Sequence, residues 1–139
     1  MRILVIDAQG GGVGRQLVQQ IKADIPGADV LAVGTNSTAA SAMLKAGADT
    51  AATGENAVIV GARKADVIVG PIGIVIADAM NGEITPKMAA AVGQSDARRI
   101  LIPFNNCYTY VAGVDRSGMG ALIADALREL NETVETLEK

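Results

Sequence analysis

The chain has 139 residues, of which half are hydrophobic and 19% are charged, and its formal net charge is −3. This length and composition predict a single folded domain over residues 1–139 and exclude a disordered chain. The sequence has no histidine, which excludes Ser-His-Asp and Cys-His catalysis and a histidine general base. The single cysteine, Cys107, excludes a disulfide framework, and without histidine we expect no metal site.

Charge and hydropathy also limit the partners of the chain. The sequence has no run rich in Lys or Arg and only three aromatic residues, so we expect no binding to nucleic acid. No apolar run reaches the roughly 18 residues that a membrane-spanning helix needs. The N-terminus starts with a strand pattern rather than a signal peptide. We therefore expect a cytoplasmic protein that does not bind a membrane.

Apolar runs and helical spacings alternate along the first half of the chain. Aliphatic runs predict strands over 3–6, 30–33 and, more weakly, 50–53. Amphipathic spacing predicts a helix that starts at Val13 and ends at Pro26-Gly27. Two further helices are expected over 37–46, with Asn36 or Ser37 as its cap, and over 55–64.

The second half continues the alternation with shorter elements. Strands are expected over 67–69 and 100–102, and a short helix, or alternatively a strand, over 74–80. A further helix is expected over 87–92, with Thr85 as its cap and Pro86 in its first turn. A short sixth strand is considered over 110–114. It would be antiparallel or irregular, because the preceding connection is too short for a parallel crossover. A long final helix is expected over 117–138.

This order predicts an α/β fold: a three-layer, doubly wound (Rossmann-like), mostly parallel sheet. Right-handed crossovers and a glycine-rich first turn favour the strand order 3-2-1-4-5. The strand order then reverses between the first and fourth strands, and ligands bind at such a point, beyond the carboxyl ends of the strands. The loops at that edge are residues 7–14, 34–37, 70–73 and 104–109.

Residues 7–14, called here the glycine loop, link the first strand to the first helix. Glycines let a phosphate approach backbone amides, and the following helix N-terminus attracts negative charge. We therefore predict a phosphate or nucleotide site. The loop residues expected to line it are Gly10, Gly11, Gly12, Val13, Gly14 and Arg15.

The sequence of the glycine loop matches several nucleotide-binding motifs only in part. G-x-G-x-x-G fits Gly10 and Gly12 but has Arg15 in the third position, where Arg15 would add a phosphate contact. G-x-x-x-G-x-G fits Gly12 and Gly14 but has Ala8 first. A Walker A loop would have Arg15 in place of lysine and no hydroxyl for magnesium, which argues against an NTPase. The remaining alternative is a tight turn without a ligand.

The end of the second strand bears on which nucleotide binds. An NAD site has Asp or Glu there for the ribose hydroxyls, whereas an NADP site has Arg for the 2′-phosphate. This chain has Thr35 and Asn36, which can hydrogen-bond a ribose but supply neither charge. NAD, NADP, another nucleotide and a smaller phosphorylated metabolite all remain candidates.

Four further groups are candidates in the second half. Residues Gly70, Pro71, Ile72 and Gly73 either line the ligand site or only shape a turn. Asn105 and Asn106 are expected to hydrogen-bond a ligand. Cys107 is a weak candidate nucleophile, because no histidine can activate it and free cysteines are usually buried. Glu83 is a weak candidate general base, and Asp78 is either a buried carboxylate or a solvated helix residue.

The last helix carries an apolar stripe. The spacing of its members is close to a heptad seam: Met119, Ile123, Leu127, Leu130, Val134 and Leu137. A helix of about twenty residues spans ~30 Å, longer than a typical strand, so its end is expected to extend beyond the sheet. We therefore predict a homodimer or higher homo-oligomer held partly by this helix.

Several blocks of sequence resemble a known family. Residues 1–115 resemble an uncharacterised family of small bacterial proteins, the domain of unknown function 3842, in segments 6–14, 70–73, 82–86, 102–107 and 111–114. The resemblance implies a Rossmann-like domain and no assigned activity. The family pattern has glycine at the position of Ala8, and its loss here argues against a dehydrogenase-type turn.

Taken together, the residues indicate a Rossmann-like protein that binds a nucleotide or a phosphorylated ligand, with NAD or NADP as candidate cofactors. The alternative is a non-catalytic small-molecule sensor or interaction module, which fits the missing histidine and the lack of a substrate domain. A small oxidoreductase that is active as a dimer ranks third. Whether any reaction is catalysed is left open.

Overall fold

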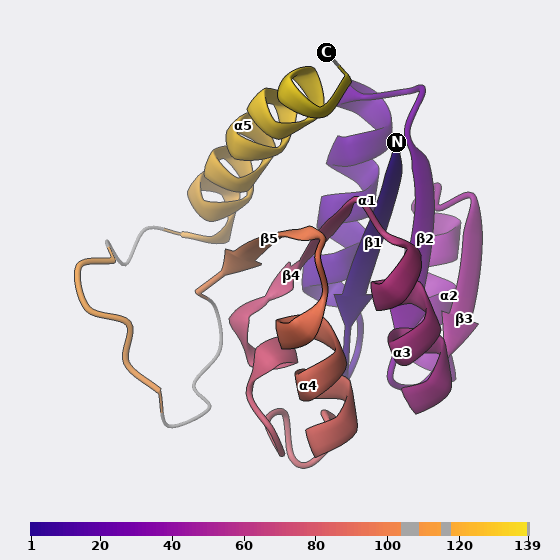
Figure 1. Cartoon of the computed structure of the whole chain (residues 1–139), viewed down its shortest axis with the longest axis vertical. Coiled ribbons are helices and arrows are strands. Elements are labelled where there is room, and N and C mark those ends of the chain that lie inside the picture. The colour runs from indigo at the N-terminus through magenta and orange to yellow at the C-terminus, as the bar shows by residue number, and fades with distance from the viewer. Residues whose placement is uncertain (104–108, 115–117, 139) are drawn as a thin grey trace.

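A five-stranded parallel sheet forms the centre of the molecule (Figure 1). The structure is a computed structural model and describes residues 1–103, 109–114 and 118–138. The strand order is β3-β2-β1-β4-β5, as predicted. All four strand pairs are parallel. The strands are β1 (Arg2–Asp7), β2 (Asp29–Gly34), β3 (Thr50–Thr53), β4 (Val67–Pro71) and β5 (Arg98–Ile102).

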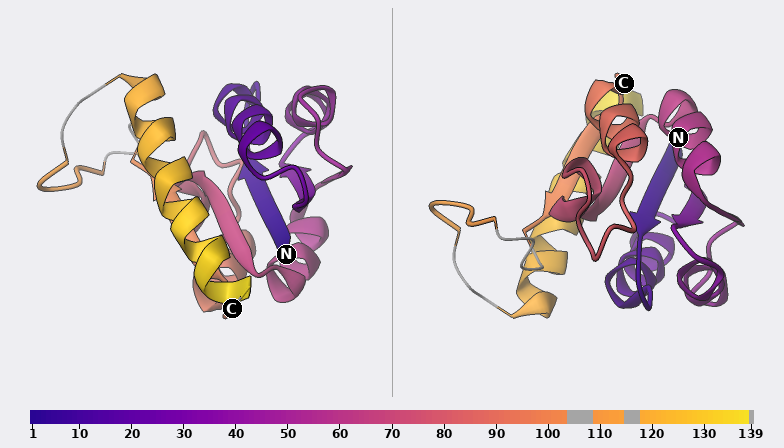
Figure 2. Two further views of the ribbon diagram at one scale, coloured as in Figure 1. Left: turned by 90° about the horizontal axis from the view of Figure 1, so that it is seen from above. Right: turned by 90° about the horizontal axis from the view of Figure 1, so that it is seen from below.

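Helices cover both faces of the sheet. They are α1 (Gly12–Asp24), α2 (Ser37–Lys45), α3 (Glu55–Lys64), the 3₁₀ helix η1 (Ile72–Val75), α4 (Pro86–Gln94) and α5 (Met119–Glu138). α1, α2 and α5 share one hydrophobic core with the sheet, and α3, η1 and α4 share the other. Figure 2 shows the sheet between these two helical layers, so the predicted three-layer α/β fold is confirmed.

Successive side chains of the central strands point into opposite cores. Ile3 and Val5 of β1 lie in the core shared with α1, whereas Leu4 and Ile6 lie in the core shared with α3 and α4. All four are at most 1% exposed. A strand that is buried on both faces needs a continuous apolar run, which is why the sequence of β1 does not alternate.

Two helix starts follow the local rules that the sequence indicated. The Asn36 side chain caps α2 by accepting a hydrogen bond from the Ala39 amide at 2.8 Å. The Thr85 hydroxyl caps α4 by accepting one from the Met88 amide at 3.1 Å, with Pro86 as the first helical residue. Both caps lie at the carboxyl edge of the sheet, so they also fix the loops there.

Two local predictions are wrong. The expected helix over 74–80 is replaced by η1 and a turn in which Asp78 and Met80 have positive φ angles of 66° and 56°. Ile84 and Met80 are buried, and their anchoring in the core outweighs the local helix propensity of residues 77–80. Residues 110–114 form no strand, and Tyr110 is 74% exposed.

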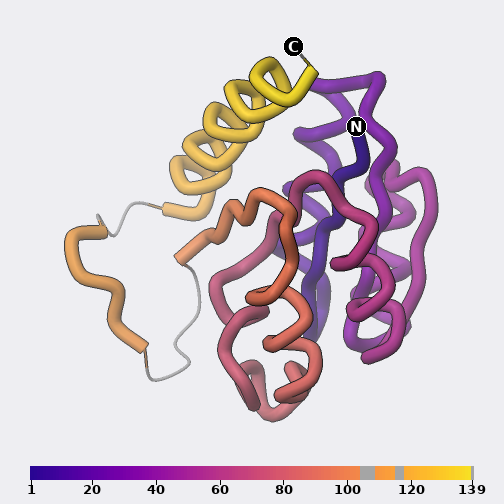
Figure 3. Tube along the Cα trace, in the orientation of Figure 1, coloured from indigo at the N-terminus to yellow at the C-terminus, as the bar shows by residue number. Residues whose placement is uncertain are grey.

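The apolar stripe of α5 is mostly covered by the chain itself. Leu127, Leu130 and Val134 are 5%, 0% and 7% exposed and lie in the core that α5 shares with α1 and the sheet, whereas Leu137 is 52% exposed. Figure 3 shows α5 running along one side of the molecule to the end where the N-terminus lies. These three side chains therefore need no partner subunit to cover them, because α1 and the sheet do so, and the homo-oligomer stays a prediction.

The described part of the chain contains no helix that is long and apolar enough to span a membrane. It also contains no group of three or more acidic or cysteine side chains that could hold a metal ion.

Candidate functional site

Asp7 fixes the two ends of the glycine loop through hydrogen bonds to its carboxylate. It ends β1, is 4% exposed, and is the only buried charged residue among those the structure describes. Its Oδ1 accepts a hydrogen bond from the Ala8 amide at 2.8 Å and its Oδ2 accepts one from the Gly14 amide at 2.6 Å. Burial raises the pKa of Asp7, against these hydrogen bonds, which lower it. The nearby charge of Glu83 raises the pKa further.

Two of the four loop glycines are required by packing. A Cβ on Gly11 would lie 2.8 Å from the Cα of Ala39, and Gly11 has a φ of +73°. A Cβ on Gly14 would lie 2.5 Å from the sulfur of Met43 and 2.8 Å from the Cβ of Asp7. The interpretation as a tight turn therefore accounts for these two positions, because any larger residue would collide with α2 or with Asp7.

The other two loop glycines, Gly10 and Gly12, are exposed and face open space. A Cβ at either position would meet no atom within 4 Å, and neither residue has a positive φ. Among the described residues, their amides donate no hydrogen bond. Arg15 follows in the first turn of α1 with an exposed side chain that forms no ion pair with any described residue. The loop therefore presents two free amides and a cation to solvent.

Glu83 joins the glycine loop to the end of β2. Its Oε1 accepts hydrogen bonds from the Gln9 amide at 2.9 Å, the Thr35 hydroxyl at 2.6 Å and the Asn36 side chain at 2.9 Å. The Asn36 side chain also donates to the Gln9 carbonyl at 2.9 Å. Three loops that are distant in sequence are thus held together at the carboxyl edge of β1 and β2.

Partial burial raises the pKa of Glu83, but the hydrogen bonds from Thr35, Gln9 and Asn36 outweigh it, so the net pKa is lowered. A general base works best with a pKa near the working pH, which Glu83 does not have. The geometry therefore suits Glu83 to a fixed negative charge and a hydrogen-bond acceptor.

The other predicted residues are placed as follows. Gly70 and Pro71 belong to β4 and are buried, and a Cβ on Gly70 would lie 2.6 Å from the carbonyl oxygen of Ile6. Gly73 is buried in η1, and Ile72 is partly exposed. This segment is needed for the close approach of β4 to β1. Asn105, Asn106 and Cys107 lie outside the described residues.

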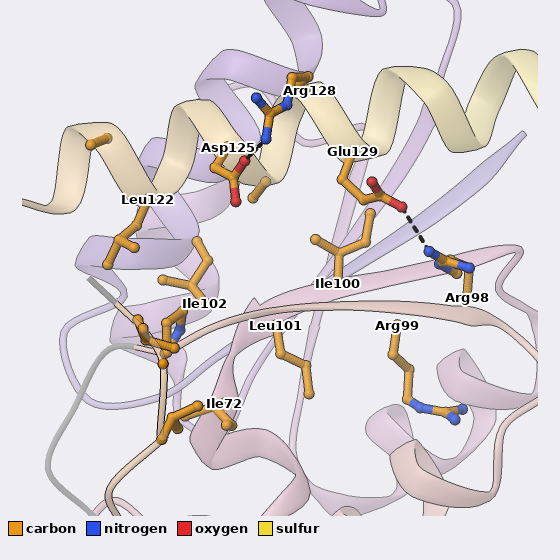
Figure 4. A pocket seen from close by; sticks show the side chains of 16 residues that line it. Ile72, Arg98, Arg99, Ile100, Leu101, Ile102, Leu122, Asp125, Arg128 and Glu129 are labelled. Atoms are coloured by element: carbon orange, nitrogen blue, oxygen red, sulfur yellow. Dashed lines mark hydrogen bonds and ion pairs between the residues drawn. The ribbon is translucent and has the colours of Figure 1, made fainter. Parts of the chain in front are cut away.

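Three cavities lie away from the glycine loop. One of about 680 Å³ lies between β5 and α5, where Arg98 pairs with Glu129 at 2.7 Å and Arg128 pairs with Asp125 (Figure 4). A second, of about 730 Å³, lies between α1 and α5, and a third, of about 350 Å³, lies beside α3 at the start of β1. No residue of the glycine loop lines any of these three.

The sequence missed Asp7 as a site residue and missed the role of Glu83. A signal existed for Asp7, because it is the one charged residue at the end of an apolar strand and directly precedes the glycines. No local signal existed for Glu83, whose turn sequence, Asn81-Gly82-Glu83, is typical of an ordinary loop.

Comparison with known proteins gives one match. The family model described as Domain of unknown function (DUF3842) matches residues 2–135. No curated protein and no solved structure matches the chain. With nearly its whole length matched, the α/β chain described above belongs to the DUF3842 family.

Proposed function

We propose that the glycine loop binds the phosphate of a nucleotide or of another phosphorylated ligand, with NAD and NADP among the candidates. The observation that carries the proposal is the difference between the loop glycines. Packing accounts for Gly11 and Gly14, whereas a Cβ at Gly10 or Gly12 would meet no atom within 4 Å. Glycine at these two exposed positions lets a ligand come close to the backbone amides.

The positive charge at the start of α1 supports the same proposal. The N-terminus of α1 carries a partial positive charge and has no acidic residue in its first turn. Arg15 adds a full positive charge beside Gly12. The Asp7 carboxylate lies beneath the loop and receives the Ala8 and Gly14 amides. A phosphate would therefore use the outward-facing amides of Gly10 and Gly12.

Between the two functional classes, the state of Glu83 favours a binding or sensor module over an oxidoreductase. Glu83 is the candidate general base of the chain, and its lowered pKa and three hydrogen bonds make it a weak proton acceptor. We therefore place ligand binding, rather than proton transfer, at this edge of the sheet.

The test is a thermal-shift screen with NAD, NADP, FAD, ATP, AMP and coenzyme A, followed by the Gly12→Val variant. A ligand at 100 times its dissociation constant stabilises the fold by about 2.7 kcal/mol. Gly12→Val places a branched side chain where the phosphate would lie, so we expect a folded protein whose melting temperature no longer responds to the ligand.

Gly93→Val is the matched control, because Gly93 is an exposed helical glycine of α4 whose Cβ would also meet open space. It should keep the full ligand response. If no compound shifts the wild-type melting temperature, or if Gly12→Val responds as the wild type does, the phosphate site is wrongly placed.

A further inference from the structure

The carboxylate of Glu83 lies at the end of β2, although Glu83 belongs to the segment between η1 and α4, more than forty residues later in the chain. Thr35 and Asn36, the residues that follow β2, both donate to its Oε1, and so does the amide of Gln9 in the glycine loop. A negative charge is thereby placed between the glycine loop and the end of β2.

This position has a defined use in doubly wound sheets. When such a sheet binds a dinucleotide, an acidic residue at the end of the second strand accepts hydrogen bonds from the ribose hydroxyls. β2 of this chain ends without one, since Gly34, Thr35 and Asn36 carry no charge. Glu83 brings a carboxylate to the same place from another part of the chain.

Among the residues that the structure describes, only one of the two carboxylate oxygens of Glu83 has hydrogen-bond donors. All three hydrogen bonds go to Oε1, and among the described residues Oε2 accepts none. An ionised carboxylate only accepts hydrogen bonds, so Oε2 is suited to hydroxyl groups and unsuited to phosphate oxygens. The side chain is partly exposed, which leaves it accessible.

The backbone around Glu83 holds it in place. Asn81 and Gly82, the two preceding residues, have φ angles of 59° and 85°. The Asp78 amide donates to the carbonyl of Ile84 at 2.7 Å, which closes the turn, and Ile84 itself is 1% exposed. A carboxylate held this way loses little further freedom when a ligand binds.

We propose that Glu83 binds the ribose of the nucleotide, with Oε2 accepting hydrogen bonds from the cis-diol while the phosphate lies on the glycine loop. The inference rests on the proposed function and narrows it to ribonucleotides with a free 2′-hydroxyl. A 2′-phosphate would place negative charge against Glu83, and residues 34–38 contain no arginine to offset it. The site should therefore prefer NAD to NADP.

The test compares ADP with 2′-deoxy-ADP, and NAD with NADP, by calorimetry on the wild-type chain. A hydrogen bond to a charged acceptor corresponds to about a ten- to hundredfold difference in dissociation constant, so ADP and NAD should bind more tightly by that factor. In Glu83→Gln the preference for ADP should fall to within about twofold. Glu129→Gln, which alters a carboxylate of α5 on the far side of β5, should keep the preference.

Inorganic pyrophosphate separates the two proposals, because it has no ribose. Pyrophosphate binding that is lost in Gly12→Val but unchanged in Glu83→Gln supports a phosphate site that is independent of Glu83. If the wild type binds ADP and 2′-deoxy-ADP equally, or prefers NADP, the ribose assignment is overturned while the phosphate site stands. If neither pyrophosphate nor any nucleotide binds, both proposals fail. If Glu83→Gln does not fold, the wild-type comparisons of ADP with 2′-deoxy-ADP and of NAD with NADP still test the ribose assignment.

Discussion

The amide of Gly14 donates a 2.6 Å hydrogen bond to the carboxylate of Asp7, seven residues earlier in the chain. This contact ties the first turn of α1 to the end of β1 and sets the shape of the loop between them. Phosphate-binding loops usually present such amides to the ligand. Here the Ala8 and Gly14 amides donate to the Asp7 carboxylate, whereas the Gly10 and Gly12 amides donate to no acceptor within the described part of the chain.

Replacing Asp7 with Asn should destabilise the fold in a pH-dependent way. Asn presents an amide group to one of the two backbone N–H donors, which should cost about 1–3 kcal/mol. Burial raises the pKa of Asp7 above its ordinary value of 3.8, so its contribution to stability is complete below 3.8 and declines as the pH rises through the folded-state pKa. The difference in unfolding free energy between wild type and Asp7→Asn should therefore narrow from pH 3.5 towards pH 7. Urea titrations across this range measure it, and a gap that widens with pH would contradict the raised pKa.

The two kinds of loop glycine should respond in opposite ways to alanine. Gly14→Ala forces a Cβ to within 3 Å of Asp7 and Met43, and overpacking of this kind costs about 1–3 kcal/mol. Gly12→Ala adds a Cβ in open space at the first residue of α1, where the smaller backbone entropy of alanine should raise stability by about 0.5–1 kcal/mol. Thermal unfolding of the two variants side by side checks the difference. Equal effects would mean that the loop packs differently from this description.

Asp49 should stabilise the fold at neutral pH and lose that effect in acid. Its Oδ2 accepts hydrogen bonds from the Val30 amide at 2.8 Å and from Lys22 at 2.9 Å, and these lower the pKa of Asp49. Because the pair is substantially exposed, Asp49→Asn should cost only about 1 kcal/mol at pH 7. The loss should disappear as the pH falls through the lowered pKa. Asp24→Asn, at an exposed carboxylate of α1, is the control and should change stability little at either pH.

Shortening a buried side chain of α5 to alanine should lower the free energy of unfolding rather than dissociate subunits. Leu130 is fully buried, so Leu130→Ala should cost about 2–5 kcal/mol, whereas Leu137→Ala, at a half-exposed position, should stay within about 0.5 kcal/mol. Denaturant titrations measure both, and light scattering reports the oligomeric state. A Leu130→Ala protein of unchanged stability but smaller mass would restore the subunit-interface interpretation.

The sheet could be predicted because its signals are local. The double-sided burial of Val67, Ile68 and Val69 requires an uninterrupted apolar run, and that run is visible in the sequence. The glycine-rich first turn and the handedness of crossover connections then settle the strand order. The caps at Asn36 and Thr85 also follow from residue type and position alone.

The site could be predicted only in part. The glycine loop follows from the sequence, but the division of its glycines into packed and exposed positions does not. The location of Glu83 depends on how the turn after η1 folds back over β1 and β2. The sequence around Asp78 and Met80 favours a helix, and only the burial of Met80 and Ile84 in the tertiary structure overrides it. The stripe on α5 was ambiguous for another reason. A spacing of three and four residues is the same whether the helix packs on its own sheet or on a second subunit.

The bonds from Gln9 and Asn36 to Glu83 join residues that are 74 and 47 positions apart, which affects the order of events during synthesis. The glycine loop and Asn36 emerge from the ribosome with the first three strands, whereas their acceptor emerges only after β4. At 5–20 residues per second, the 47 and 74 positions that separate Asn36 and Gln9 from Glu83 take about 2 to 15 seconds. During that interval the glycine loop and Asn36 lack their hydrogen bonds to the Glu83 carboxylate. The edge of the sheet proposed to bind the ligand is complete only after the second half of the sheet has been synthesised.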